Sequence, residues 1–176
     1  ATIGFRGIPF AEPPLGGLRL RPPEPAACVQ TLRSAQTFGP LCPQYDGEGA
    51  VVGDEDCLQL NLWTPAALPG PAERLPVLFF MHGGGNVQGG VSVEAPAGVP
   101  LYDGALLAER EHVIVVTTAY RLGALGFLAH PDLAAESGED ASGNYGLRDQ
   151  LLALRWVQDN IDRFGGDPTR VLLFGE

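Results

Sequence analysis

Two runs of apolar and β-branched residues, at positions 77–81 and 113–119, constrain the fold of this chain more than any other feature. Runs of this kind, bounded by turn-forming residues, are typical of strands that are buried on both faces of a sheet. Between them, Asp103 is placed to cap a helix that continues to Arg110, with the acidic end first and the basic end last. A strand, a helix and a strand in this order predict an α/β fold with a largely parallel central sheet flanked by helices.

Further elements are predicted on either side of this unit. Residues 57–63 alternate between leucine and other residues, which predicts a strand with one buried face. Near the C-terminus, Gly165 and Gly166 are suited to end a long helix, and residues 171–174 predict another buried strand. The apolar stripe that predicts this helix consists of Leu147, Leu151, Leu154, Val157, Ile161 and Phe164.

Charge excludes several classes of partner and cofactor. The net charge is -10 and none of the 11 basic residues is lysine, which disfavours nucleic acid as a partner and rules out a Walker-type phosphate loop.

His82, His112 and His130 lack the spacing of metal ligands, so we predict no metal and no cofactor. The apolar runs are far shorter than the roughly 20 residues of a transmembrane helix, so we expect no membrane span.

The sequence His82-Gly83-Gly84-Gly85 directly follows the run at 77–81. Backbone amides in such a loop can stabilise the oxyanion that forms when an acyl carbonyl is attacked, and glycines allow the close approach. A glycine-rich turn that binds nothing is the alternative, and it is favoured if the motif is taken alone. A dinucleotide-binding loop is disfavoured because its third glycine would fall at Gln88.

The predicted strand at 171–174 is followed by Gly175 and Glu176. A nucleophile elbow has the pattern G-x-S-x-G on a sharp turn between a strand and a helix. The chain supplies the strand, the first glycine and the next residue, so we expect a serine to follow Glu176. The alternative is a strand that simply enters a loop.

Seven segments together resemble the type-B carboxylesterases, the cholinesterase-like family of α/β-hydrolases. The match covers almost all of the chain but only an N-terminal portion of the family's catalytic domain. We therefore expect residues 1–176 to be the N-terminal portion of a single α/β-hydrolase domain, inactive without the remainder of the same polypeptide. The matching segments are residues 7–14, 55–58, 60–63, 82–85, 120–123, 143–147 and 164–168.

The resemblance implies a role for each residue of the predicted site. Gly84 and Gly85 match the oxyanion-hole glycines, and Gly83 matches the turn glycine before them. Glu176 matches the acidic residue beside the nucleophile. We assign Gly83 and Asn86 to substrate binding. Asn86 replaces an apolar or aromatic residue of many relatives, which weakens inference about the substrate.

The chain has three cysteines. From the residues alone, a bond between Cys42 and Cys57 and a set of three buried thiols are about equally supported. The resemblance implies the Cys42–Cys57 disulfide and leaves Cys28 as an extra buried thiol. A disulfide favours an oxidising compartment, so the protein is expected to be secreted or periplasmic.

The resemblance also implies ion pairs of Arg19 with Glu55 and of Arg121 with Asp149.

Choline esterases carry a tryptophan between the two cysteines that stacks on the cationic substrate. Residues 43–56 contain no tryptophan, so a choline substrate is disfavoured. The absence of lysine and the richness in alanine, glycine and proline fit a bacterial enzyme.

The complete protein is therefore expected to hydrolyse small carboxylic esters through a serine acyl-enzyme, with an acidic residue and a histidine later in the chain. A catalytically inactive cholinesterase-like binding or adhesion protein is the alternative. A third interpretation is a truncated scaffold that only retains the fold.

Overall fold

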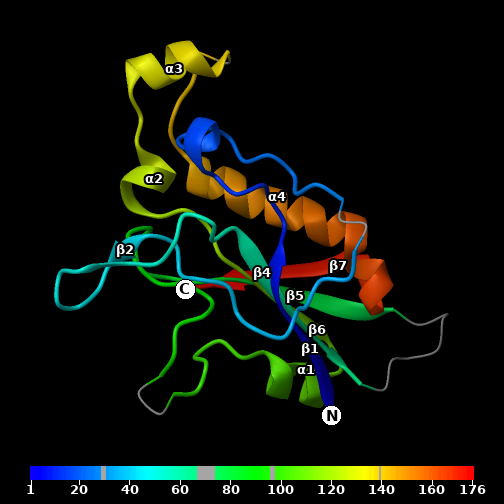
Figure 1. Cartoon of the computed structure of the whole chain (residues 1–176). Coiled ribbons are helices and arrows are strands. Elements are labelled where there is room, and N and C mark those ends of the chain that lie inside the picture. The colour runs from blue at the N-terminus through cyan, green and yellow to red at the C-terminus, as the bar shows by residue number, and fades with distance from the viewer. Residues whose placement is uncertain (29–30, 67–73, 96–97, 139) are drawn as a thin grey trace.

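The computed structural model describes residues 1–28, 31–66, 74–95, 98–138 and 140–176. Its centre is a five-stranded sheet, with a separate two-stranded hairpin (Figure 1). In spatial order the sheet strands are β1 (Thr2–Pro9), β4 (Gln59–Pro65), β6 (Ile114–Thr118), β5 (Leu75–Met81) and β7 (Gly166–Gly175). The hairpin strands are β2 (Gln44–Tyr45) and β3 (Val51–Val52).

The direction of the strands fits the predicted class. β4 is antiparallel to both of its neighbours, β1 and β6, whereas β5 is parallel to β6 and to β7. β4 alone therefore runs against the other strands of this sheet. The prediction of an α/β fold with mostly parallel strands is confirmed.

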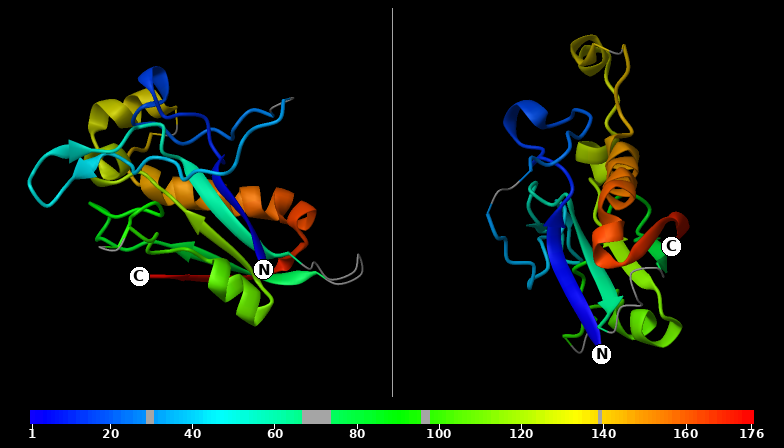
Figure 2. Two further views of the ribbon diagram at one scale, coloured as in Figure 1. Left: turned by 60° about the horizontal axis from the view of Figure 1, so that its bottom comes forward. Right: turned by 90° about the vertical axis from the view of Figure 1, so that its right-hand side faces the viewer.

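Helices cover both faces of the sheet. α4 lies on one side of the strands and α1 on the other (Figure 2, left). The helices are α1 (Ala105–Glu111), α2 (Gly123–Phe127), α3 (Pro131–Ser137) and α4 (Tyr145–Asn160), with 3-10 turns η1 (Gly16–Leu18) and η2 (Ile161–Phe164). The helix α1 begins where predicted, but its N-cap residue is Gly104 rather than Asp103; the Asp103 carboxylate accepts a hydrogen bond from the Ala105 amide at 2.8 Å from one residue further back.

The central strands contribute to two cores. Ile114 and Val116 of β6 pack in the cluster that contains Val157 of α4, whereas Val115 packs with Ala108 of α1. Alternate residues of a strand point to opposite faces, so β6 is buried on both sides, as predicted.

The prediction of one buried face for the strand at 57–63 is wrong. Leu60 and Leu62 lie in the α4-side core, but Trp63 is fully buried on the α1 side and Asn61 is also buried. The Asn61 side chain accepts a hydrogen bond from the Gly7 amide and donates one to Thr117, so the polar group is paired inside the protein. The alternation wrongly indicated an exposed face, because α1 covers that face of the sheet.

The predicted apolar stripe of α4 is also partly wrong. Leu147 and Leu151 are 47% and 57% exposed, and Asp149 between them is fully buried. The side of α4 that faces the core is Tyr145, Asp149, Leu152, Ala153 and Val157. A buried charge in the middle of this side hid it from an argument based on apolar spacing. The α-helix itself ends at Asn160, and the 3-10 turn η2 continues it to Gly165, which has a φ of 86°.

β7 is longer than predicted and less buried. Leu172, Leu173 and Phe174 are 61%, 48% and 38% exposed. Among the described strands β7 pairs only with β5, so it forms one edge of the sheet. The prediction of a buried strand over residues 171–174 does not hold within the described residues.

Candidate active site at the ends of two parallel strands

The predicted glycine loop and Glu176 lie side by side because β5 and β7 are neighbours. Met81 is paired with Gly175 in the parallel register, and the Glu176 amide donates to the Met81 carbonyl at 3.3 Å. The Glu176 side chain lies over Gly83, where an added Cβ would be 3.0 Å from its Cβ and Cγ. The residue at position 83 therefore has to be small for the carboxylate to occupy this place.

The loop itself requires glycine at Gly84. Its φ is +109°, and an added Cβ would lie 2.0 Å from the Gln88 carbonyl oxygen. The Gly84 carbonyl accepts hydrogen bonds from the Val87 and Gln88 amides, which closes a tight turn. Within the part of the chain that the structure describes, the amides of Gly84 and Gly85 have no hydrogen-bond partner.

His82 anchors the start of the loop. Its ring is 2% exposed and stacks on the Tyr120 ring at a centroid distance of 4.3 Å. Nδ1 lies 2.9 Å from the Gly83 carbonyl oxygen, and because a carbonyl only accepts, Nδ1 carries the proton. Burial lowers the pKa of His82, which favours the neutral ring. The Tyr120 hydroxyl donates to the His82 carbonyl at 2.7 Å.

An open cleft of about 350 Å³ lies beside this loop. Gly83, Gly84 and Glu176 line it, as do Tyr102 and the first residues of the β2–β3 hairpin. The Tyr102 hydroxyl donates to Glu176 Oε2 at 3.2 Å, and its ring packs on Phe80 at a centroid distance of 4.7 Å. Burial, the hydrogen bond to Glu176 and the charge of Glu176 all raise the pKa of Tyr102, so the hydroxyl stays protonated.

The structure brings together only some of the predicted site residues. Gly83, Gly84 and Glu176 share the cleft, whereas Gly85 and Asn86 follow on the exposed side of the loop and are not among the lining residues. The Asn86 carbonyl accepts a hydrogen bond from the Gly123 amide at 2.7 Å. Sequence reasoning missed Tyr102 and Gln44, since neither lies in a motif and both reach the cleft from elsewhere in the chain.

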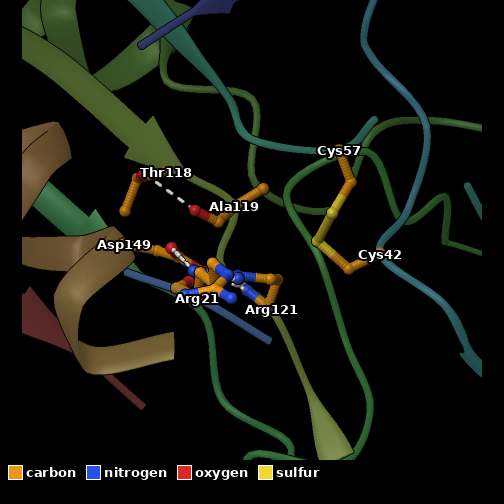
Figure 3. Close-up of polar contacts among 7 residues, drawn as sticks. All are labelled: Arg21, Cys42, Cys57, Thr118, Ala119, Arg121 and Asp149. Atoms are coloured by element: carbon orange, nitrogen blue, oxygen red, sulfur yellow. Dashed lines mark hydrogen bonds and ion pairs between the residues drawn. A yellow bond between two sulfur atoms is a disulfide. The ribbon is translucent and has the colours of Figure 1, made fainter. Parts of the chain in front are cut away.

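The disulfide between Cys42 and Cys57 is present and both residues are buried (Figure 3). The pairing that the resemblance implied is therefore confirmed. The bond closes a loop that contains the β2–β3 hairpin, which lies beside the cleft. The expectation that Cys28 is buried is wrong, because this free cysteine is exposed.

Both predicted ion pairs form. Arg121 donates from Nε and Nη2 to the two carboxylate oxygens of Asp149, at 2.9 and 2.7 Å, and its Nη1 donates to the Arg21 carbonyl (Figure 3). This pair is buried, and it orients the chain that enters α2 against α4. Arg19 and Glu55 make a bidentate pair at 2.7 and 2.6 Å near the surface, with 50% of the Arg19 side chain exposed.

Residues 1–28, 31–66, 74–95, 98–138 and 140–176 contain neither a membrane-spanning helix nor a metal-binding cluster. No helix there has the length and apolar composition needed to cross a membrane. No group of three or more histidine, cysteine, aspartate or glutamate side chains is arranged there to hold a metal ion.

Comparison with known proteins gives consistent matches. A sequence model of the carboxylesterase family matches residues 1–176. The fumonisin B1 esterase of Sphingopyxis macrogoltabida is 48% identical over 176 residues, which cover 98% of this chain and 31% of that protein. Carboxylesterase 1E of Mus musculus is 44% identical over 186 residues, which cover 98% of this chain and 30% of that protein.

Solved structures match as closely. A PNB esterase superimposes with a TM-score of 0.84 at 41% identity, over 99% of this chain and 34% of its own. A thermophilic PNB esterase superimposes with a TM-score of 0.84 at 40% identity, over 99% of this chain and 35% of its own. The chain thus spans about a third of the length of these relatives.

Proposed function

This chain belongs to the carboxylesterase family and has the α/β-hydrolase fold, and from that premise we propose that the complete protein hydrolyses carboxylic esters through a serine acyl-enzyme. Residues 1–176 are then the N-terminal portion of one catalytic domain. Gly84 and Gly85 supply oxyanion-binding amides, Gly83 and Asn86 contribute to the substrate side of the loop, and Glu176 precedes the nucleophile.

One observation carries the proposal. The amides of Gly84 and Gly85 have no partner in the described part of the chain, although the rest of the loop is firmly held beside Glu176. Amides fixed in this way can stabilise negative charge on a substrate oxygen without reorganising during the reaction, and one such donor contributes roughly 3 to 4 kcal/mol to catalysis.

The proposed reaction proceeds in two stages. The serine after Glu176 attacks the ester carbonyl, its proton passes to a histidine, and the carbonyl electron pair becomes an oxyanion held by the Gly84 and Gly85 amides. The histidine then gives the proton to the departing alcohol. Water hydrolyses the acyl-serine by the same steps in reverse. In this proposal the negative charge of Glu176, next to the nucleophile in the sequence, favours the cationic histidine that forms in each stage.

The substrate is proposed only as a class. Fumonisin B1 is the ester named for the relative from Sphingopyxis, and the mammalian relative is named as a carboxylesterase without a substrate. For this chain we propose small carboxylic esters, with choline esters disfavoured because residues 43–56 hold no tryptophan.

The test combines mass and activity. The complete protein is weighed intact before and after treatment with a fluorophosphonate, and its hydrolysis of a panel of p-nitrophenyl esters is followed. We expect one phosphonyl group per chain and loss of hydrolysis in parallel. A folded protein that takes up no label and hydrolyses no ester would instead fit an inactive binding protein of the same fold.

A further inference from the structure

Gln44 joins the disulfide-closed loop to the glycine loop. Its side-chain Oε1 accepts a hydrogen bond from the Gly89 amide at 2.7 Å, and its Nε2 donates to the Gly89 carbonyl at 2.8 Å. Nε2 also lies 3.0 Å from the carbonyl oxygen of Cys42. One amide side chain thus satisfies both backbone polar groups of Gly89 and remains tied to the disulfide next to it.

The first of these bonds fixes the peptide between Gln88 and Gly89. In a planar trans peptide the N–H and the C=O point in opposite directions. With the Gly89 amide held by Gln44, the Gln88 carbonyl is directed the other way, onto Gly84, where an added Cβ would lie 2.0 Å from its oxygen. Gln44 therefore determines which group packs against the α-carbon of Gly84.

The second bond holds the next peptide, between Gly89 and Gly90, so Gln44 is bonded to both peptides that meet at the α-carbon of Gly89. An added Cβ at Gly89 would lie 2.5 Å from the Gly83 carbonyl oxygen and 2.8 Å from His82 Nδ1. The Gly83 carbonyl belongs to the same peptide plane as the Gly84 amide, so contact at that oxygen constrains the direction of the amide hydrogen. The contacts that begin at Gln44 thus reach the Gly84 amide through both Gln88 and Gly83.

We propose that Gln44 is a positioning residue for the oxyanion loop, and that it couples the Cys42–Cys57 loop to the direction of the Gly84 amide. This inference rests on the proposed function, because it concerns how well that amide meets the developing oxyanion. Gln44 itself need not contact the reacting atoms. Its loss should reduce transition-state stabilisation more than it reduces substrate binding.

Three variants of the complete protein test the proposal. Gln44→Ala removes all three bonds, and Gln44→Met removes them while keeping most of the volume. Gln158→Ala is the matched control, since the Gln158 side chain also donates to a backbone carbonyl, that of Pro168 at 2.9 Å, but is not among the residues that line the cleft. The measurements are kcat, KM, melting temperature and the affinity for a trifluoromethyl ketone, which adds the serine oxygen to form a tetrahedral alkoxide.

We expect kcat to fall about 10- to 100-fold in both Gln44 variants, because small misplacements of catalytic groups have effects of this order. Affinity for the ketone should fall by a similar factor, while KM stays within about threefold. Gln158→Ala should keep kcat and ketone affinity within about twofold of the unsubstituted protein.

Gln44→Glu adds a readout that depends on pH. Its carboxylate can still accept from the Gly89 amide but cannot donate to the carbonyls of Gly89 and Cys42, whereas the protonated acid can. The ratio of its kcat to that of the unsubstituted protein should therefore rise as the pH is lowered.

A folded Gln44→Met variant with unchanged kcat and unchanged ketone affinity would overturn the proposal. So would equal falls in kcat for Gln44→Met and Gln158→Ala, which would indicate a general loss of stability. Failure of the proposed function is distinguishable, because then the unsubstituted protein itself neither hydrolyses esters nor takes up fluorophosphonate.

Discussion

The two walls of the cleft are built differently. The glycine loop, residues 82–90, is held by side chains from distant parts of the chain: Tyr120 on the His82 carbonyl and ring, and Gln44 on Gly89. The tip of the β2–β3 hairpin is held mostly by itself, since Asp46 accepts hydrogen bonds from the amides of Glu48 and Ala50.

Packing shows the same contrast. An added Cβ at Gly84 or Gly89 would collide with backbone atoms, whereas one at Gly47 or Gly49 would meet nothing within 4 Å. Tyr45, at the base of the tip, is 69% exposed. The closer packing at Gly84 and Gly89 suits the fixed donors of a reaction, and the open hairpin tip suits contact with varied substrates. Changes in the glycine loop should therefore affect catalysis, and changes at the hairpin tip should not.

The largest expected effect is that of Gly84→Ala. The new Cβ would require the Gln88 carbonyl to move, and the positive φ disfavours any residue other than glycine. Displacing the Gly84 amide should lower kcat by about 10²- to 10³-fold. Steady-state kinetics of the complete protein with a p-nitrophenyl ester measures it, and a kcat within threefold of the unsubstituted protein would contradict the assignment.

The next largest effect is expected for the Cys42–Cys57 disulfide, which closes the loop that carries the β2–β3 hairpin. Replacing both Cys42 and Cys57 by alanine removes a cross-link between residues 15 positions apart, which should lower the free energy of unfolding by about 3 kcal/mol in the chain-entropy account. Cys28→Ala is the control, since this thiol is free and exposed. Urea unfolding of the complete protein compares them, and equal midpoints would refute the structural role of the disulfide.

A smaller effect is expected at the Glu176 side of the cleft. Tyr102→Phe removes the hydroxyl that donates to Glu176 Oε2 but keeps the ring on Phe80. Loss of one such bond is worth about 1 kcal/mol, so kcat should fall roughly fivefold. The melting temperature should stay nearly constant. A large fall in melting temperature with unchanged kcat would mean that Tyr102 contributes to packing and not to catalysis.

The glycine-loop wall should also respond to pH. Burial lowers the pKa of His82 below the ordinary value of 6.5, so the unfolded chain takes up a proton there before the folded one does. The free energy of unfolding should then decline as the pH falls below about 6.5. Denaturant unfolding of the complete protein between pH 8 and pH 5 should show a shallower decline for His82→Gln than for the unsubstituted protein. Parallel profiles would contradict this.

The smallest effect should come from the hairpin tip. Gly49 has a φ of +86°, comparable to that of Gly84, but open space around it. Gly49→Ala carries the backbone strain without the collision, so stability should fall by only about 1 kcal/mol and kcat should stay within about twofold. A kinetic loss as large as that of Gly84→Ala would remove the contrast between the walls.

Local patterns in the sequence predicted the parts of the fold that depend on local chemistry. The strands β5 and β6, the hydrogen bond from the Ala105 amide to Asp103 at the start of α1, and the left-handed Gly165 after η2 follow from short-range rules. The face of α4 could not be predicted in this way, because Asp149 is buried by a partner in a distant segment, Arg121.

The site residues also fall into two groups: those that local sequence patterns predicted and those that they did not. Gly83, Gly84 and Glu176 stand out in the sequence because each lies at the end of a predicted strand, and the pairing of β5 with β7 brings them together. Gln44 and Tyr102 carry no such signal. Their positions beside the cleft depend on the disulfide loop and on the segment before α1, whose paths are set by tertiary packing.

The central claim is that the Gly84 and Gly85 amides bind the oxyanion beside the residue that follows Glu176. A crystal structure of the complete protein after reaction with a phosphonate tests it most directly. The phosphonyl oxygen mimics the oxyanion, and we expect it about 2.7 to 3.1 Å from both amide nitrogens. A phosphonyl oxygen bound by other groups, with both glycine amides turned toward solvent, would contradict the claim.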